Sequence, residues 1–417
     1  MSTPAAPSRR LMDAHDRRTM TQSRFLSLLE GSKTPLLGDG AMGTMLNGRG
    51  ISFDQCFDAL NLNHPATVAD IHRAYIKAGS QIIQTNTFGA NRFKLASHGL
   101  ESKVAEINRA GVDLARRAIL ASYRDVLVAG DVGPLGVRMA PFGRVQPEQA
   151  RQAFAEQITA LVEAGVDLII IETFSDLYEI REAVTAARQV TGLPIVASMS
   201  FTRDDRTLLG DAPDQAAKSL LECCVDLIAI NCSGGPAQIW RIVRQMRQAA
   251  PQARFSVMPN AGWPEQVGGR VMYPANPDYF GEYARAFCEG GASLVGGCCG
   301  TTPLHIAAMR AALDKASEGC SDLVGDTFTF IDIDERTETP GNRTHFAEKL
   351  SDGKFVVSVE MDPPRGLSAH KLLAGASLLA EAGVDVINVA DSPMARMRMS
   401  PWAVCSLIQR EFGVETT

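Results

Sequence analysis

The sequence predicts an α/β protein whose main part is a closed (β/α)₈ barrel. From Thr34 onward, short apolar runs rich in β-branched residues alternate with longer segments of helical periodicity, which is typical of repeated βα units around a parallel sheet. Eight such runs and eight following helical segments fit into about 290 residues, the usual size of a closed barrel. The whole chain has 417 residues, so a second, smaller domain is expected.

Each predicted strand is a short apolar run that leads into a polar or glycine-rich segment. In chain order the strands are predicted at 36–39, 81–86, 126–131, 167–172, 195–200, 226–231, 254–260 and 293–298. The helices are predicted at 67–78, 101–121, 147–163, 177–190, 215–224, 237–249, 278–289 and 303–316. Phrases such as Ala164-Gly165-Val166-Asp167 join a helix to the next strand, because glycine accepts the left-handed conformation that ends a helix.

The pattern changes after the eighth predicted helix. An acidic, threonine-rich stretch at 332–342 is typical of a connecting segment. A new βα pattern follows, with strands at 355–361 and 386–390, helices at 368–382 and 401–411, and the start of a third strand at 413–417. Two βα units cannot cover both faces of a parallel sheet, so this part resembles the opening of a second, incomplete TIM barrel. We therefore expect a disordered leader at 1–24, a barrel at 25–316, a linker at 317–345 and a barrel fragment at 346–417.

Composition argues against several classes of function. The formal net charge is -6 and the basic residues are scattered, so the electrostatic footprint of a nucleic-acid-binding protein is missing. No run approaches the roughly 20 apolar residues of a membrane span, and Asp13 and Asp16 are out of character for a transit peptide. Nine cysteines without the spacing of a secreted disulfide framework indicate a reducing, cytoplasmic compartment. Small-molecule chemistry is favoured.

Three cysteines form the strongest candidate site, because the working residues of a (β/α)₈ barrel lie at the C-terminal ends of its strands. Cys232 follows the sixth predicted strand, and Cys298 and Cys299 end the eighth, so the three thiols can converge above the barrel axis. Zinc binds thiolates tetrahedrally, and three protein ligands leave one position for water or substrate. We expect the flanking glycines to let neighbouring side chains point at one ion. The alternative role, a small buried hydrophobe, is the one we predict for the cysteines in helical segments, Cys223, Cys224, Cys288 and Cys405.

The chemistry of such a site differs from that of a zinc hydrolase. None of the seven histidines ends a predicted barrel strand, which disfavours a histidine-carboxylate site. A zinc ion with three thiolates is a poor Lewis acid for water, but it can bind and deprotonate a substrate thiol, whose free pKa is near 8.5. The bound thiolate is a nucleophile at neutral pH, so the pattern favours alkyl transfer onto sulfur.

Five phrases between about residues 25 and 316 resemble the homocysteine S-methyltransferase family. They are Gly38-Asp39-Gly40-Ala41-Met42-Gly43-Thr44, Gln84-Thr85-Asn86-Thr87-Phe88, Glu172-Thr173-Phe174, Asn231-Cys232-Ser233 and Gly296-Gly297-Cys298-Cys299-Gly300. The resemblance implies that Cys232, Cys298 and Cys299 bind Zn²⁺ and that the sulfur of homocysteine takes the fourth position.

The same resemblance implies a set of contacts to the amino acid. Asp39 and Glu172 would bind its ammonium, and Asn86 would line the pocket. Asn260 could cover the zinc when substrate is absent, and Gly89 stands where betaine-using relatives carry a tyrosine, which argues against betaine as the donor. The carboxylate of the substrate would meet the backbone amides of a glycine-rich turn formed by Gly40, Ala41, Met42 and Gly43.

The C-terminal part resembles the start of methylenetetrahydrofolate reductase, and this order of regions matches bifunctional proteins that join both activities. The resemblance implies that Glu360, at the end of a strand, is the acid that protonates the folate. Most of the flavin-binding barrel is missing, so FAD is expected only with a complete reductase barrel. The phrases that carry the resemblance are Val357-Ser358-Val359-Glu360-Met361-Asp362-Pro363-Pro364-Arg365-Gly366 and Val386-Ile387-Asn388-Val389-Ala390-Asp391.

The sequence therefore predicts a zinc-dependent methyltransferase of one-carbon metabolism that forms methionine from homocysteine. The methyl donor stays open among S-methylmethionine, S-adenosylmethionine, methylfolate and a methyl-corrinoid. A zinc-thiolate scaffold, acting as an interaction module of a methyl-cycle assembly without activity of its own, is the alternative. An open fourth coordination position distinguishes the two hypotheses.

Overall fold

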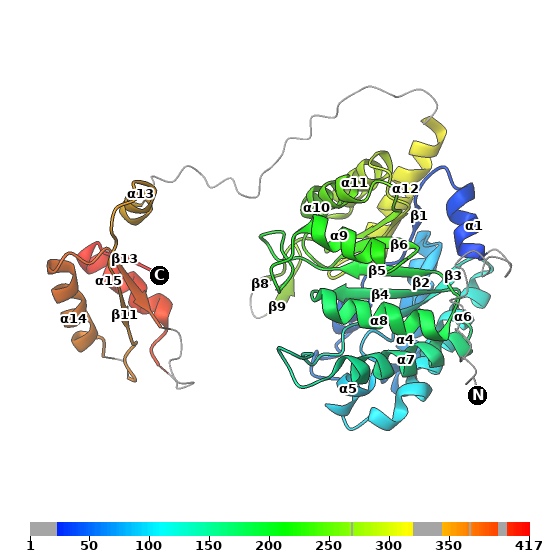
Figure 1. The fold of residues 1–417 in the computed structure, drawn as a ribbon, viewed down its shortest axis with the longest axis horizontal. Coiled ribbons are helices and arrows are strands. Elements are labelled where there is room, and N and C mark those ends of the chain that lie inside the picture. The colour runs from blue at the N-terminus through cyan, green and yellow to red at the C-terminus, as the bar shows by residue number, and fades with distance from the viewer. Residues whose placement is uncertain (1–22, 268–269, 320–343, 367, 391–397) are drawn as a thin grey trace, which may run out of the picture. The chain divides into compact units, whose positions relative to one another are not determined.

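The chain folds into two units, which a computed structural model describes over residues 23–267, 270–319, 344–366, 368–390 and 398–417 (Figure 1). The division between the units falls between Leu323 and Val324, within the segment predicted as a linker. Most of the predicted leader, residues 1–22, lies outside the described residues. Each unit is described on its own.

The first unit contains the predicted barrel strands in the predicted order. They are β1 (Leu36–Leu37), β2 (Ile82–Gln84), β3 (Leu127–Val132), β4 (Leu168–Phe174), β5 (Ile195–Met199), β6 (Leu227–Asn231), β7 (Phe255–Met258) and β10 (Leu294–Val295). Neighbouring strands pair in parallel in the order β1-β10-β7-β6-β5-β4-β3-β2. The predicted (β/α)₈ fold class is confirmed.

Hydrogen bonds between residues in or next to β1 and β2 close the barrel between these two strands. The backbone amide of Gln81 donates to the Leu37 carbonyl at 2.7 Å, and Gln81 Oε1 accepts from the Leu37 amide at 3.1 Å. Toward the C-terminal ends of these strands, Asp39 Oδ2 accepts from the Gln84 amide at 2.9 Å. The seam therefore relies on side chains, and one of them belongs to a predicted site residue.

The barrel helices are α4 (Pro65–Ala78), α6 (Val104–Ser122), α7 (Pro147–Glu163), α8 (Leu177–Val190), α9 (Pro213–Glu222), α10 (Pro236–Ala249), α11 (Pro277–Glu289) and α12 (Pro303–Gly319). Several begin one or two residues earlier than predicted, because proline occupies the first helical position of α4, α9, α10 and α11. Proline suits that position, since the N–H that it lacks would have no helical partner there.

The inside of the barrel is filled by alternate residues of the strands, among them Ile82, Leu127, Ala129 and Ile170. A helix that the sequence analysis missed, α1 (Arg24–Gly31), adds the fully buried Phe25 to this inner cluster. A larger cluster packs between the strands and the surrounding helices. The inner cluster thus closes the N-terminal end of the barrel with apolar side chains.

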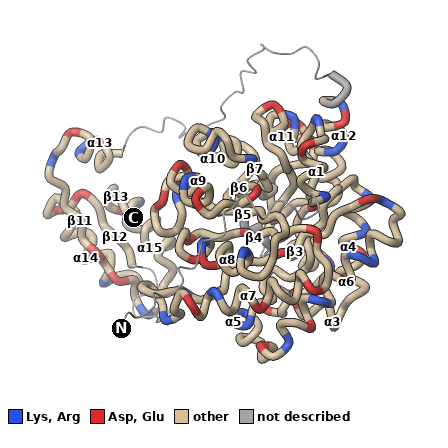
Figure 2. The backbone as a smooth tube through the Cα atoms, turned by 45° about the vertical axis from the view of Figure 1, so that its right-hand side comes forward, with Lys and Arg blue, Asp and Glu red and all other residues tan. Residues whose placement is uncertain are grey.

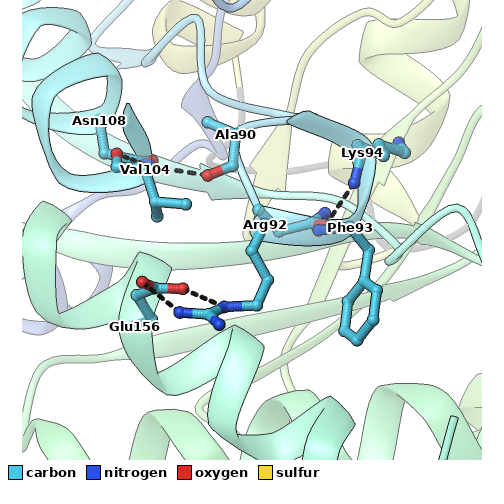
Figure 3. A network of polar contacts seen from close by, with 8 residues as sticks. Ala90, Arg92, Phe93, Lys94, Val104, Asn108 and Glu156 are labelled. Atoms are coloured by element: carbon cyan, nitrogen blue, oxygen red, sulfur yellow. Dashed lines mark hydrogen bonds and ion pairs between the residues drawn. The ribbon is translucent and has the colours of Figure 1, made fainter. Parts of the chain in front are cut away.

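Short elements surround the opposite end. They are α2 (Gly43–Asn47), α3 (Leu60–Asn63), α5 (Arg92–Ala96), the 3-10 turn η1 (Glu101–Lys103), and the hairpin of β8 (Glu265–Val267) and β9 (Arg270–Met272). All but η1, which lies within the helix predicted at 101–121, were not predicted. Figure 3 shows how α5 is anchored: Arg92 pairs with Glu156 of α7 through two contacts of 2.7 Å, and Asn108 of α6 donates to the Ala90 carbonyl at 2.8 Å. The loop after β2 is therefore fixed to two helices.

The second unit contains three parallel strands, β11 (Ser358–Met361), β12 (Val386–Val389) and β13 (Glu415–Thr416), in that order. Its helices are α13 (His345–Ser351), α14 (His370–Glu381) and α15 (Pro401–Phe412). The third strand lies where the sequence placed its start. Ile387, Val389, Val404 and Ile408 belong to a small core of its own.

Charged residues are dispersed over the helices. Figure 2 shows blue and red segments interspersed along the tube, and ion pairs such as Arg151 with Glu182 at 2.7 Å link neighbouring helices. Among the described residues, none of the helices combines the length and the apolar character that a membrane crossing requires.

Candidate metal centre

Three cysteine sulfurs gather at the C-terminal end of the barrel. Cys232 directly follows β6, and Cys298 and Cys299 follow β10. The Sγ atoms of Cys232 and Cys299 are 3.7 Å apart, and all three sulfurs lie within 4.8 Å of one another. Thiolates that share one tetrahedral zinc at about 2.3 Å stand roughly 3.8 Å apart, so the spacing fits a single ion. Over the described part of the chain, no fourth Cys, His, Asp or Glu joins this group.

The end of β7 holds the two cysteine loops together. The Cys298 amide donates to the Pro259 carbonyl at 2.8 Å, and the Asn260 amide donates to the carbonyl of Gly234, two residues after Cys232, at 2.9 Å. Cys232 has a left-handed backbone with φ of 49°, a conformation that non-glycine residues rarely adopt. Because β7 lies between β6 and β10, the segment that follows it lies between the two cysteine loops. The bend at Cys232 is part of the geometry that brings the sulfurs together.

The glycines around the cysteines permit close approach of loops, and the role predicted for them at the ion stays a prediction. A Cβ atom at Gly297 would lie 2.5 Å from Thr301 Oγ1, and one at Gly300 would lie 2.2 Å from the ring of Tyr273. Gly300 also has φ of 78°, in the left-handed region that favours glycine. The backbone is thus packed too tightly for larger residues at these positions.

Two residues that the sequence analysis did not select contact the cluster. Asn231 Nδ2 lies 3.8 Å from Cys298 Sγ and donates to Glu172 Oε2 at 3.0 Å, while its Oδ1 accepts from Ser198 Oγ at 2.7 Å. The Tyr273 side chain lies close enough to Cys299 to lower the pKa of that thiol. The signal for Asn231 was its place at the end of β6, beside Cys232, whereas Tyr273 follows the hairpin that was not predicted.

The three thiols share protons unequally. Hydrogen bonds from Cys232 and Cys298 lower the pKa of Cys299 to about 3. Hydrogen bonds to Cys232 and Cys299, together with burial, raise the pKa of Cys298. The hydrogen bond with Cys298 lowers the pKa of Cys232. The hydrogen bond with Cys299 and burial raise that pKa by more, so the net effect is a rise. One thiolate is favoured in the protein alone, and a dication among the sulfurs would stabilise the others.

Asp39 and Glu172 are both buried at this end of the barrel. Burial raises the pKa of Asp39, and burial together with the nearby Cys299 raises the pKa of Glu172 to about 7. Within the described residues Asp39 Oδ1 is buried without a hydrogen-bond partner, whereas Glu172 Oε2 accepts from Asn231. A cation that entered beside Asp39 would find an unpaired acceptor there.

The glycine-rich turn after β1 is braced from both sides. The Ala41 amide donates to Thr301 Oγ1 at 3.1 Å, and the Tyr75 hydroxyl donates to the Ala41 carbonyl at 2.7 Å. Gly43 begins α2, directly after Met42. One of the amides predicted to meet a carboxylate is therefore engaged within the chain.

Asn86 and Asn260 differ in how their amides are used. Asn86 Nδ2 donates to the Phe57 carbonyl at 2.8 Å and to Asn61 Oδ1 at 3.0 Å, so its donor group holds a loop in place. Among the described residues Asn260 Oδ1 is buried without a hydrogen-bond partner, and Asn260 lies between Pro259 and Ala261, which both contact the loop of Cys298 and Cys299. The substrate role of Asn86 and the metal-covering role of Asn260 stay predictions.

The other predicted residues do not belong to the cysteine cluster. Helix α9 ends at Glu222, so Cys223 and Cys224 fall outside it, and Cys224 is exposed rather than buried. Cys288 in α11 and Cys405 in α15 are half-buried. Glu360 belongs to the second unit, where it is exposed on β11 and accepts from Asn388 Nδ2 at 3.3 Å.

The barrel that carries this cysteine cluster is similar to solved structures. The homocysteine methyltransferase MmuM from Escherichia coli, in its metallated form, is 26% identical with a TM-score of 0.58, and the match covers 68% of this chain and 98% of that one. Its oxidized form matches with the same identity and TM-score, over 69% of this chain.

Curated relatives extend the likeness to longer proteins. The chain is 32% identical over 299 residues to methionine synthase of Mycobacterium leprae and 33% identical over 297 residues to that of Mycobacterium tuberculosis. Each match covers 68% of this chain but only 25% of the relative, so the chain matches a quarter of their length. The family model described as homocysteine S-methyltransferase matches residues 36–313, and the chain therefore belongs to this family of methyltransferase enzymes.

Proposed function

We propose that the barrel transfers a methyl group from a donor to the thiol of homocysteine, forming methionine, at a zinc ion held by Cys232, Cys298 and Cys299. The observation that carries this proposal is the sulfur cluster, whose 3.7 Å spacing between Cys232 and Cys299 suits one tetrahedral ion. Three protein ligands leave one position for the substrate sulfur. A metallated relative of similar fold, MmuM, supports the choice of a metal.

The residues around the cluster suit an amino-acid thiol. When bound, zinc would supply a Lewis acid that lowers the pKa of the substrate thiol. Asp39 Oδ1, buried and unpaired, would accept a hydrogen bond from the ammonium, and Glu172 would add negative charge nearby. Asn231 would keep Glu172 and Cys298 at fixed separation, since its amide contacts both. Fixed positions of this kind lower the entropy cost of methyl transfer.

The transfer itself is a displacement at carbon. The thiolate sulfur of homocysteine forms a bond to the methyl carbon while the bond from that carbon to the donor breaks, and the donor leaves with the electron pair. The donor would be S-methylmethionine, S-adenosylmethionine, methylfolate or a methyl-corrinoid. We also propose that the protein works in a reducing, cytoplasmic compartment, where the thiols stay available.

A scaffold without activity is the alternative proposal. A structural zinc site is normally closed by four protein ligands. Among the described residues the cluster offers three ligands of the Cys, His, Asp and Glu types, which favours an enzyme.

Methionine formation by the zinc-loaded chain, with homocysteine and each donor in turn, tests the proposal. Turnover with a sulfonium donor would identify a self-sufficient enzyme, and turnover only with methylfolate or a methyl-corrinoid would identify one half of a folate-coupled system. Tight zinc binding without turnover for any donor would favour the scaffold.

For the second unit we propose the opening of a methylenetetrahydrofolate reductase-like barrel, with domain bounds at 25–316 and 346–417 for the two parts. Three parallel strands joined by helices support this, and Glu360 lies on the first of them. FAD would bind only to a complete barrel. Flavin absorbance after incubation with FAD and gel filtration checks this: no retained flavin is expected, and stoichiometric flavin would contradict it.

A further inference from the structure

We propose that Asp131 and Gln84 complete, together with Asp39, the seat for the ammonium group of the amino-acid substrate. The inference rests on the proposed function and assigns two further residues to the same site. It concerns the side of the barrel mouth formed by β1, β2 and β3.

The strand pattern directs Gln84 and Asp131 into the barrel. Ile82 of β2 and both Leu127 and Ala129 of β3 belong to the inner cluster. Side chains alternate between the two faces of a strand, so Gln84 and Asp131 continue these inward rows toward the C-terminal ends. Gln84 is the register partner of Ala129, which places Asp131 one inward position further along the neighbouring strand.

Three acceptor atoms in this region have no donor. Asp39 Oδ1, Gln84 Oε1 and Asp131 Oδ1 are each buried without a hydrogen-bond partner within the described chain. Asp39 and Gln84 are held side by side by the 2.9 Å bond from the Gln84 amide to Asp39 Oδ2. Buried acceptors are normally paired, and a buried carboxylate needs a cation or donors. An ammonium group brings three N–H donors and one positive charge.

The backbone of Asp131 is fixed by hydrogen bonds, while its Oδ1 has no partner among the described residues. Its amide donates to Thr85 Oγ1 at 3.0 Å, and its carbonyl accepts from Thr87 Oγ1 at 2.7 Å. Asp131 is 6% exposed as a residue, so water has little access to it. A rigid, desolvated carboxylate is a preorganised partner for a charged ligand.

Neighbouring groups do not fill the seat. The Lys94 ammonium, whose charge acts on Asp58 and Asp131 from a distance, lies 4.1 Å from the centroid of the Phe88 ring and forms no ion pair with a carboxylate in the part of the chain that the structure describes. Glu172 is connected to the metal side, because its Oε2 accepts from Asn231, which also contacts Cys298. Asp131 and Gln84 therefore complement Asp39 on the side away from the sulfurs.

A pair of ligands isolates the contact to the ammonium. Binding of homocysteine and of 4-mercaptobutanoate, which lacks only the amino group, is measured by calorimetry on the zinc-loaded chain and on Asp131→Asn. We expect Asp131→Asn to weaken homocysteine binding by roughly 10- to 100-fold, as for loss of a charge-assisted hydrogen bond, and to leave 4-mercaptobutanoate unchanged. Gln84→Met should give a smaller loss that also depends on the amine.

Asp58→Asn is the matched control. Asp58 is a buried carboxylate near the same mouth, but its Oδ1 already accepts from the Gly89 amide at 2.8 Å. One contrary result is that Asp58→Asn weakens homocysteine binding as much as Asp131→Asn does, with 4-mercaptobutanoate binding unchanged in both variants. That result would overturn the proposal, because the negative charge of the whole region, and not a contact with Asp131, would then explain the loss of affinity. Equal weakening of both ligands, or no weakening, by Asp131→Asn would also overturn it. If the unmodified chain binds neither thiol, the proposed function fails and the seat with it.

Discussion

The two ends of the barrel use buried space in opposite ways. At the N-terminal end, Phe25 and the inner residues of the strands form a cluster of apolar side chains with almost no exposure. At the C-terminal end, Asp39, Asp131 and Asn260 carry buried acceptors without partners. Buried unpaired acceptors cost free energy, so one end stabilises the fold while the other holds groups that lower its stability until a donor pairs with them.

Cys298→Ser should have the largest effect on activity. It should affect the C-terminal end of the barrel and leave the fold unchanged. A hydroxyl is a poor substitute for thiolate at zinc, so the variant is expected to lose the metal and to lower methyl transfer by more than ~100-fold, the upper range for loss of an outer contact to a metal ligand. Metal analysis and methionine formation check this, with circular dichroism to follow the fold. Cys224→Ser, which changes an exposed cysteine outside the cluster, is the control. Full metal content in Cys298→Ser would contradict the ligand assignment.

Phe25→Ala should show the reverse behaviour. The ring is fully buried in the inner cluster, so its removal is expected to lower the free energy of unfolding by about 3–5 kcal/mol. Zinc content at low denaturant should be unchanged, since Phe25 lies at the other end of the barrel. Urea unfolding measures the loss, and Leu28→Ala, on an exposed side chain of the same helix, should cost far less. A larger effect on zinc than on stability would argue against the division between the two ends.

The alternation of strands and helices was enough to predict the barrel, because the spacing of apolar residues in the local sequence distinguishes a strand from a helix. The convergence of Cys232 with Cys298 and Cys299 could also be predicted, since barrel topology brings alternate strand ends together. The contacts of Asn231 could not, because they depend on which neighbour a polar side chain meets after folding. Helix α1 was missed for a similar reason, since Phe25 contributes only through tertiary packing.

His72 tests whether unpaired buried polar groups are confined to the mouth. It lies on α4 in the helical layer, both ring nitrogens lack partners, and burial lowers its pKa from 6.5 to about 4. The folded state therefore resists protonation, so the stability present above pH 6.5 is lost as pH falls toward 4. From pH 7 to pH 5 the imidazole should remove about 2 kcal/mol of the free energy of unfolding.

His72→Leu should abolish that part of the pH dependence, as measured by urea unfolding at both pH values. The exposed His64→Leu serves as a control for loss of an imidazole. An unchanged slope in His72→Leu would mean that other groups cause the acid sensitivity of the chain.

Tyr75→Phe should give the smallest effect, and it bears on how the helical layer supports the mouth. The Tyr75 hydroxyl donates to the Ala41 carbonyl at 2.7 Å and lies 3.2 Å from the Thr301 carbonyl, so one side chain of α4 joins the loops that follow β1 and β10. Its loss should cost about 1 kcal/mol of stability, the usual net value of one hydrogen bond.

The more informative readout of Tyr75→Phe is the ratio of its effects on binding and on stability. The ring would keep its apolar contacts, so the fold should survive, while the turn from Gly40 to Gly43 would lose its outer brace. We expect the KM for homocysteine to rise by roughly 3- to 10-fold at nearly unchanged zinc content, on the basis of one lost hydrogen bond. Stability loss without any change in KM would show that the turn is rigid without Tyr75, and that the helical layer contributes to the mouth only by packing.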